Sequence, residues 1–219
     1  MKISVLTIFP SLFDSFLKSP VIERAIKKGL LDLEILDIKE YADGCFRKID
    51  DSPYGGGPGM ILRVDTLCQA LDAVKTDKSK VVLFSPKGCK YNQIKAHEYK
   101  ELEHLILVCG HYEGVDARFE SYVDEMLSIG DYVMTGGELA AQVVCDSVVR
   151  LIKGSLRDGA TEQESFENGL LEYPQYTHPY EFRGVKVPDI LLSGNHGLIE
   201  KWKQEQAVSE TQKFRPDML

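Results

Sequence analysis

The stretch KVVLFSPKGCKYNQIKAHEYKELEHLILVCG, residues 80–110, decides the fold class. Two short apolar runs, 80–86 and 104–110, flank a polar segment, 92–101, that is typical of a helix. Continuous apolar runs of this length indicate strands buried on both faces of a sheet. Strands joined through a helix run parallel to each other. The stretch therefore predicts a parallel α/β sheet.

The same alternation of strand and helix patterns continues outward from this stretch. Apolar or alternating runs predict strands at 3–8 and 31–38 and at least one within 126–134. Helical spacing predicts helices at 11–29 (broken at Pro20), at 64–74 (with Asp65 as the N-cap) and at 137–154 (ending at Gly154).

A shift in composition after Gly154 predicts a second, smaller domain. We expect a first domain at 1–155, a polar linker at 156–165 and a C-terminal domain at 166–219. The C-terminal stretch carries prolines and aromatics first and then a helix pattern from Gly197 to Phe214. A small, mainly helical domain is therefore expected there.

The overall composition is that of an ordinary globular protein and sets limits on function. The 219 residues are 43% hydrophobic and 27% charged, with a net charge of −8, which argues against a protein that coats nucleic acid non-specifically. No apolar run is long enough for a bilayer, and residues 1–10 fit a first strand better than a signal peptide. We expect no membrane association.

The cysteines and histidines do not form a recognisable metal or disulfide pattern. The five cysteines are odd in number and lack C-x-x-C spacing, which disfavours a zinc site or disulfide framework and indicates a cytoplasmic location. The histidines lack H-x-x-x-H spacing. These residues are Cys45, Cys68, Cys89, Cys109, Cys145, His97, His104, His111, His178 and His196.

Glycine-rich turns follow several predicted strands, where parallel sheets bind their ligands. The turn SIGDYVMTGGELAA, residues 128–141, lacks the spacing of a phosphate-binding loop. The segment GHYEGVDAR places Glu113, Asp116 and Arg118 beyond a buried strand, as a pocket wall or a solvated turn. Arg150 lies in a predicted helix that is otherwise apolar. It is either a structural residue that snorkels or forms a salt bridge, or a fixed cation that faces the substrate.

Five motifs together resemble the bacterial tRNA (guanine-N1)-methyltransferase family of the SPOUT superfamily. They occur in one order along nearly the whole chain: DSPYGGGPGM, CGHYEGVDAR, SIGDYVMTGGELAA, ESFENGLLEYPQYTHP and VPDILLSGNHGLIEKW. The resemblance implies a deep trefoil knot in the C-terminal part of the α/β domain, a rare exception to the rule against threaded chains. It also implies a homodimer, S-adenosylmethionine as methyl donor and, as substrate, the tRNA guanosine immediately 3′ of the anticodon.

The resemblance also assigns roles to individual residues. Arg150 matches the arginine that stabilises negative charge on the guanine, and Glu164 stands where the family has an aspartate as general base. Glu162 and then Asp158 are the alternatives for the base, and a magnesium requirement is left open. The implied cofactor-binding residues are Leu83, Phe84, Ser85, Pro86, Gly88, Gly110, Tyr112, Glu113, Gly114, Ser128, Ile129, Gly130, Asp131, Tyr132, Val133, Met134, Gly136 and Gly137.

Charge gives only local support to RNA binding. Residues 165–219 hold 6 Lys/Arg against 8 Asp/Glu, so contact would come from local clusters, Arg183 with Lys186 and Lys201 with Lys203. His178 replaces an arginine that the family usually carries in this domain. Two alternatives remain at this stage, a related enzyme with another RNA target and a non-catalytic RNA- or nucleotide-binding module.

Overall fold

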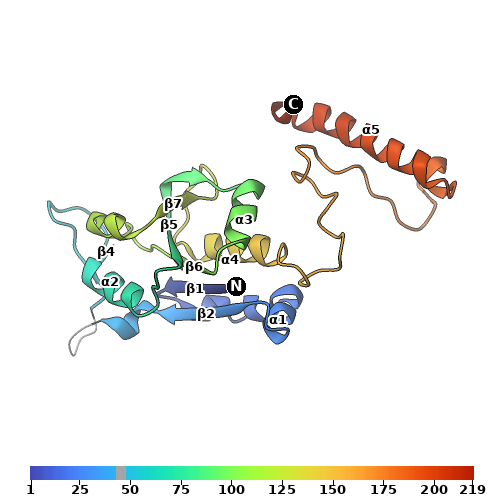
Figure 1. The fold of residues 1–219 in the computed structure, drawn as a ribbon. Helices are drawn as coiled ribbons and strands as arrows, with labels where there is room; N and C mark the ends of the chain where they lie inside the picture. The colour runs from blue at the N-terminus through green and yellow to red at the C-terminus, as the bar shows by residue number, and fades with distance from the viewer. Residues whose placement is uncertain (43–47) are drawn as a thin grey trace. The chain divides into compact units, whose positions relative to one another are not determined.

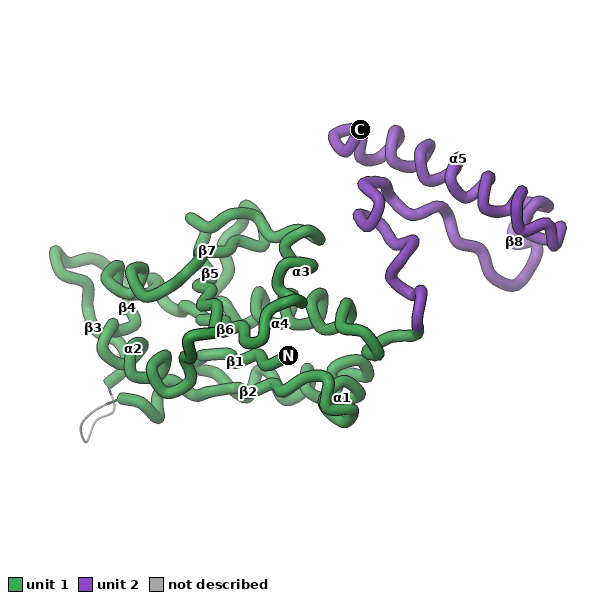
Figure 2. The backbone as a smooth tube through the Cα atoms, in the orientation of Figure 1, with its two compact units in different colours: residues 1–157 green, residues 158–219 purple. Residues whose placement is uncertain are grey.

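The computed structural model describes residues 1–42 and 48–219, which form two compact units, residues 1–157 and 158–219 (Figure 2). Cys45 lies outside the described residues, and the other cysteines, Cys68, Cys89, Cys109 and Cys145, are free thiols. Among the described helices, none has the length and apolar character needed to cross a bilayer.

The first unit is built on a five-stranded sheet in which every neighbouring pair is parallel, which confirms the predicted α/β class (Figure 1). The strand order is β2-β1-β6-β5-β7. The strands are β1 (Lys2–Thr7), β2 (Asp32–Asp37), β5 (Ser79–Lys90), β6 (His104–Val108) and β7 (Glu125–Ser128). Strands predicted at 3–8, 31–38, 80–86 and 104–110 are therefore present, with β5 extending four residues further than expected.

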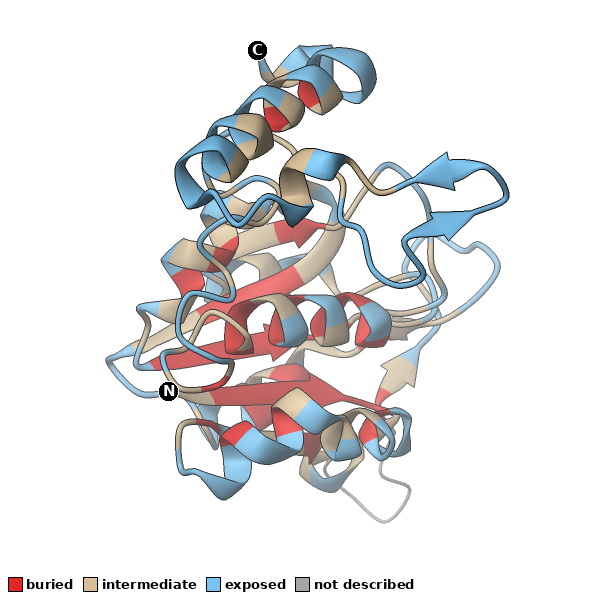
Figure 3. Ribbon diagram, turned by 90° about the vertical axis from the view of Figure 1, so that its right-hand side faces the viewer, coloured by how far each residue is buried: buried red, intermediate tan, exposed pale blue. Residues whose placement is uncertain are grey.

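Two hydrophobic clusters cover the two faces of this sheet. Ile3 and Val5 belong to one cluster and Leu6 and Ile8 to the other, as the alternation of a strand requires. The first cluster includes residues of α1 (Pro20–Lys27), α3 (Gln93–Lys100) and α4 (Glu138–Val149), and the second includes residues of α2 (Val64–Asp72). Figure 3 shows the buried residues gathered on the strands and on the sides of the helices next to them.

The helices follow the predicted order, with corrections at their ends. The helix predicted to end at Gly154 ends at Val149, and Arg150 is its C-cap. Pro20 is the first residue of α1, where a missing N–H costs nothing, but the chain before it forms short 3-10 turns, η1 (Pro10–Phe13) and η2 (Phe16–Lys18). The prediction of Asp65 as an N-cap is wrong, because the extended residue before α2 is Arg63. Asp65 lies in the first turn and binds the Arg63 guanidinium instead.

Short elements connect the main strands of the first unit. They are η3 (Ile38–Tyr41), β3 (Asp50–Asp51), β4 (Ile61–Leu62) and η4 (Ala117–Tyr122). The segment after β6 runs beside β4, where the Glu113 amide donates to the Met60 carbonyl and the Leu62 amide to the Gly114 carbonyl, both at 3.0 Å. These bonds join the DSPYGGGPGM and CGHYEGVDAR motifs.

The second unit contains less helix than the sequence suggested. Its single long helix, α5 (His196–Phe214), begins where Asn195 accepts a hydrogen bond from the Leu198 amide. The remainder is irregular chain with a hairpin, β8 (Glu181–Phe182) and β9 (Val185–Lys186), and two 3-10 turns, η5 (Asp189–Leu192) and η6 (Pro216–Met218). The irregular chain is fixed to α5 by the Leu171 amide, which donates to the buried Thr211 hydroxyl at 2.9 Å.

A charged cluster joins β5, β7 and α3 at one edge of the sheet. Glu125 is 13% exposed and forms ion pairs with Lys80 at 2.9 Å and Lys95 at 3.1 Å. The Cys89 thiol donates to the same carboxylate at 3.1 Å. Burial alone would raise the pKa of Glu125, but the bonds from Lys80, Cys89 and Lys95 outweigh it and lower this pKa to about 2.

This cluster predicts a specific acid sensitivity. The folded pKa of Glu125 lies below its unfolded value of about 4.3, so its stabilisation is complete above that value and is lost as the pH falls towards 2. Glu125→Gln should lower the free energy of unfolding at pH 7, and the difference from the unaltered protein should shrink between about pH 5 and pH 3. Urea unfolding at a series of pH values measures this.

The matched control is Glu103→Gln, which removes an exposed ion pair with Lys78. Exposed pairs contribute little to stability, so this variant should stay close to the unaltered protein at every pH. A constant difference for Glu125→Gln across the pH range would contradict the prediction.

Candidate functional site

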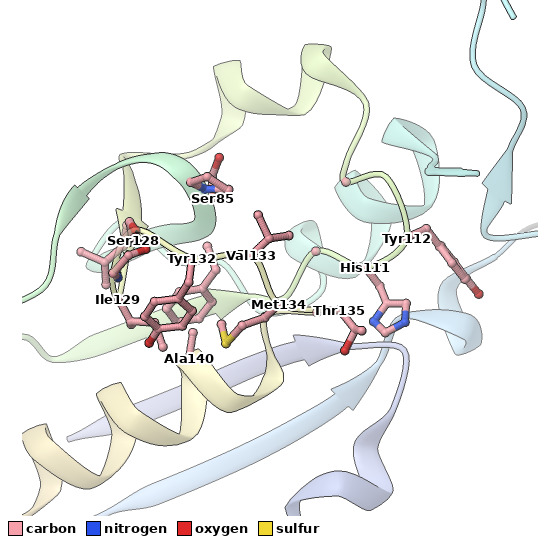
Figure 4. A pocket seen from close by; sticks show the side chains of 18 of the residues that line it. Ser85, His111, Tyr112, Ser128, Ile129, Tyr132, Val133, Met134, Thr135 and Ala140 are labelled. Atoms are coloured by element: carbon pink, nitrogen blue, oxygen red, sulfur yellow. Dashed lines mark hydrogen bonds between the residues drawn. The ribbon is translucent and has the colours of Figure 1, made fainter. Parts of the chain in front are cut away.

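A cavity of about 260 Å³ opens in the first unit, where the chain leaves β5, β6 and β7 (Figure 4). It is lined by residues 84–86 in the middle of β5, by the loop at 110–114 after β6, by residues 127–137 from the end of β7 to the start of α4, and by Ala140 in the first turn of α4. This is the position at which parallel sheets bind ligands. The lining residues are Phe84, Ser85, Pro86, Gly110, His111, Tyr112, Glu113, Gly114, Leu127, Ser128, Ile129, Gly130, Tyr132, Val133, Met134, Thr135, Gly136, Gly137 and Ala140.

The structure brings together all but three of the cofactor-binding residues predicted from the sequence. Leu83 is only 2% exposed and belongs to the core under the sheet. Gly88 packs against the backbone of β7. Asp131 points to an ion pair with Lys90 at 2.6 Å. None of the three is a lining residue.

Four lining residues were missed: His111, Leu127, Thr135 and Ala140. Each lies within or beside a motif already selected, so contiguity along the chain was the available signal. Figure 4 shows Ile129, Tyr132 and Ala140 at one end of the cavity and His111 and Tyr112 at the other.

The lining chemistry separates this cavity from a phosphate site. It consists of glycine backbone, apolar and aromatic side chains, the hydroxyl residues Ser85, Ser128 and Thr135, the imidazole of His111 and one acidic residue, Glu113. The described lining residues include no lysine or arginine. A phosphorylated ligand would gain no ion pair here and would be repelled by Glu113, whereas a neutral or cationic ligand suits the site.

Asp116 and Arg118 do not belong to this cavity, so the expected pocket wall is only partly correct. They bind each other, with the guanidinium Nη2 2.7 Å from Asp116 Oδ2. The hydrogen bond from Arg118 lowers the pKa of Asp116. Both residues line a separate groove with Arg63 and Asp65, which form a second pair of the same kind.

The two predicted catalytic residues lie in different units. Arg150 follows the last residue of α4, where its amide donates to the Asp146 carbonyl at 3.2 Å, and it is not a lining residue of the cavity. Glu164 is half-buried in the second unit and borders a cavity of about 140 Å³ beside α5. Their roles in one reaction remain predictions.

Comparison with known proteins supplies the family. The family model for "tRNA (Guanine-1)-methyltransferase TrmD" matches residues 1–219. The chain is 48% identical over 219 residues to a tRNA (guanine-N(1)-)-methyltransferase of Malacoplasma penetrans (strain HF-2), covering 100% of this chain and 97% of that protein. It is 47% identical over 223 residues to the protein of that name from Geobacter sulfurreducens (strain ATCC 51573 / DSM 12127 / PCA), covering 100% and 91%.

This chain belongs to the TrmD family. The match confirms the resemblance drawn from the five motifs, and it makes the chain a tRNA (guanine-N1)-methyltransferase. It therefore favours the methyltransferase over a non-catalytic binding module. A TrmD enzyme needs a methyl donor and a tRNA, and the cavity provides a site whose chemistry suits a cationic donor.

Proposed function

We propose that the chain transfers a methyl group from S-adenosylmethionine to N1 of the guanosine immediately 3′ of the anticodon in tRNA. The observation that carries the proposal is the cavity of this TrmD-family chain, with its glycine backbone, apolar side chains, single carboxylate and absence of lysine or arginine among the described lining residues. An adenosine with a sulfonium, which carries no phosphate, fits that lining. When bound, this donor supplies a methyl group already activated by the positive charge on sulfur.

The chain must then activate the acceptor. N1 of neutral guanine carries a proton, so a base must take it before the N1 lone pair can form the bond to the methyl carbon as the carbon–sulfur bond breaks. We assign proton removal to the Glu164 carboxylate and stabilisation of the negative charge that spreads to guanine O6 to the Arg150 guanidinium. The backbone of the loop at 127–137 would hold the donor in line with N1.

The proposal includes an assembly, which the resemblance to the family implies. We propose a homodimer in which the polar segment 156–165 of one chain completes the active site of the other. The resemblance also supports a deep trefoil knot in the C-terminal part of the α/β domain.

For RNA contact, the hairpin of the second unit has more support than α5. Arg183 sits in the turn between β8 and β9 with its guanidinium 5.2 Å from the centre of the Phe182 ring, and Phe182 is 63% exposed. An exposed aromatic beside an arginine suits stacking on an unpaired base. Lys186 of the hairpin lies 3.7 Å from Glu181, and Lys203 of α5 is held more closely by Glu200 at 2.7 Å.

Glu164→Ala is expected to reduce methyl transfer to unmodified tRNA by about 10²–10⁴-fold, because it removes the general base. Donor affinity, measured by calorimetry, should be kept. The exposed Glu205→Ala is the matched control and should retain full activity. If Glu162→Ala or Asp158→Ala loses activity instead, the base is reassigned to that residue.

A mixture of two inactive variants tests the assembly. Arg150→Ala and Glu164→Ala chains, unfolded and refolded together, should regain part of the activity, because one site of each mixed dimer has both residues intact. No recovery in mixed dimers would place both residues in sites within one chain. The same transfer assay with and without a chelator tests the magnesium requirement. Among the described residues, no group of three or more His, Cys, Asp or Glu is placed to hold a metal ion.

A further inference from the structure

Glu138 is a buried carboxylate beside the cavity that the proposed mechanism does not use. It is the first residue of α4 and is 3% exposed. Its Oε1 accepts a hydrogen bond of 2.8 Å from the hydroxyl of Thr7, at the end of β1. A buried charge is costly unless its oxygens are paired, so the second oxygen also needs a partner.

The group nearest that second oxygen is the imidazole of His111. Glu138 Oε2 lies 3.8 Å from His111 Nδ1, which is buried and has no hydrogen-bond partner of its own. The His111 side chain as a whole is 19% exposed and lines the cavity. Because Nδ1 is buried, the exposed part of the ring is the other edge, which carries Nε2.

The surroundings fix the ring in this orientation. The rings of Phe9 and Tyr112 meet the imidazole edge to face, with centres 4.8 and 5.0 Å away. Gly136 pairs with His111 as an antiparallel bridge and leaves room for the contact. A Cβ at Gly136 would lie 2.2 Å from Glu138 Oε2 and 2.5 Å from His111 Nδ1, so any side chain there would occupy the space between carboxylate and imidazole.

We propose that Glu138 is a positioning residue that acts through His111 on the methyl donor. Held by Thr7, its carboxylate receives the Nδ1–H of His111 and leaves Nε2 as a hydrogen-bond acceptor at the cavity wall for an N–H or O–H group of the donor. A carboxylate behind an imidazole fixes the tautomer in this way in many sites. The present 3.8 Å exceeds a hydrogen bond, and binding of the donor closes it. This inference rests on the proposed function of the cavity.

The charge of the cavity agrees with this role. Glu113 is a lining residue, and the Glu138–His111 pair adds a carboxylate and an acceptor beside a cavity whose described lining has no lysine or arginine. A donor with a sulfonium and an ammonium group is cationic, so both features favour it electrostatically.

A double-mutant cycle tests the proposal. Glu138→Gln should raise the dissociation constant for S-adenosylhomocysteine, a stable analogue of the donor, by about tenfold. This change corresponds to a loss of about 1.4 kcal/mol of binding free energy. His111→Phe keeps the ring packing against Phe9 and Tyr112 but removes both nitrogens. In the His111→Phe background, Glu138→Gln should have no further effect, because the path through the imidazole is already gone. Calorimetry gives the affinities and thermal melting the stability.

A purely structural role predicts a different pattern. The two substitutions would then add in their effects on affinity, or Glu138→Gln would lower the melting temperature while leaving the dissociation constant unchanged; either result overturns the proposal. Thr7→Val, which removes only the hydroxyl, allows the same cycle if Glu138→Gln does not fold. If the unaltered chain fails to bind the analogue, the donor site itself is wrong, which is distinct from binding without coupling.

Discussion

Replacing Gly88 with alanine is expected to disrupt the junction of β5 and β7 and to cost at least about 3 kcal/mol of unfolding free energy, at the upper end for overpacked sites. An alanine Cβ would lie 2.3 Å from the Leu127 nitrogen and 2.4 Å from the Met126 carbonyl carbon. The optimal van der Waals separation between such atoms is about 3.5–4.0 Å. The obstructing atoms are backbone atoms of β7, which is hydrogen-bonded to β5, so neither can move aside as a flexible side chain would.

This substitution should also impair the donor site, although Gly88 does not line it. Leu127 and Ser128, the next residues along β7, are lining residues, so a displaced β7 carries the cavity wall with it. Urea unfolding and binding of S-adenosylhomocysteine measure the two effects. The control is Gly197→Ala in α5, which meets only Asn195 Oδ1 at 3.6 Å and should be neutral or slightly stabilising. Unchanged stability of the Gly88 variant would contradict the close packing.

Arg150→Ala is expected to lower the rate of methyl transfer by about 10²–10³-fold at saturating donor, the loss typical when one group that stabilises a developing oxyanion is removed. Arg150→Lys keeps the positive charge without the planar fork, so it should recover only part of this rate. Donor affinity should hardly change, because Arg150 is not a lining residue of the cavity. Single-turnover assays with unmodified tRNA separate the rate from binding.

The control for this variant is Lys153→Ala, another cation just beyond α4 that is exposed. Arg150 also lies at the C-terminal end of α4, where a cation stabilises the helix by about 0.3–1 kcal/mol, so a small loss of stability is expected as well. If the transfer rate stays normal while stability falls, Arg150 has only that structural role.

The central sheet was predictable because its strands carry strong local signals. Runs such as ISVLTI and HLILVCG are mostly apolar and are buried along nearly all of their length, as strands covered on both faces are. The two-residue strands β3, β4, β8 and β9 are too short to show any periodicity and were not predicted. The segment before Pro20 has the spacing of a helix, but it forms 3-10 turns instead. Phe13, at the end of the first of these turns, is buried in the core.

The sequence predicted which segments line the cavity, because these segments follow recognisable strands. It did not predict which side chains within a segment point towards the cavity. Glu113, Asp116 and Arg118 follow the same strand, yet only Glu113 is a lining residue of the cavity, and Asp116 and Arg118 bind each other. Sequence patterns do not report that choice. His111 was missed for the same reason, because its relation to Glu138 and Thr7 joins three segments that are far apart in the sequence.

The lack of lysine and arginine among the described lining residues affects which adenosine-containing metabolites of a cell can bind in the cavity. ATP shares its adenosine with the proposed donor, but its phosphates would meet Glu113 with no cation among the described lining residues to receive them. Charge alone therefore discriminates against the most abundant competitors. A compound designed to compete for this cavity should accordingly keep a positive or neutral tail, and one that mimics a nucleotide phosphate should bind poorly.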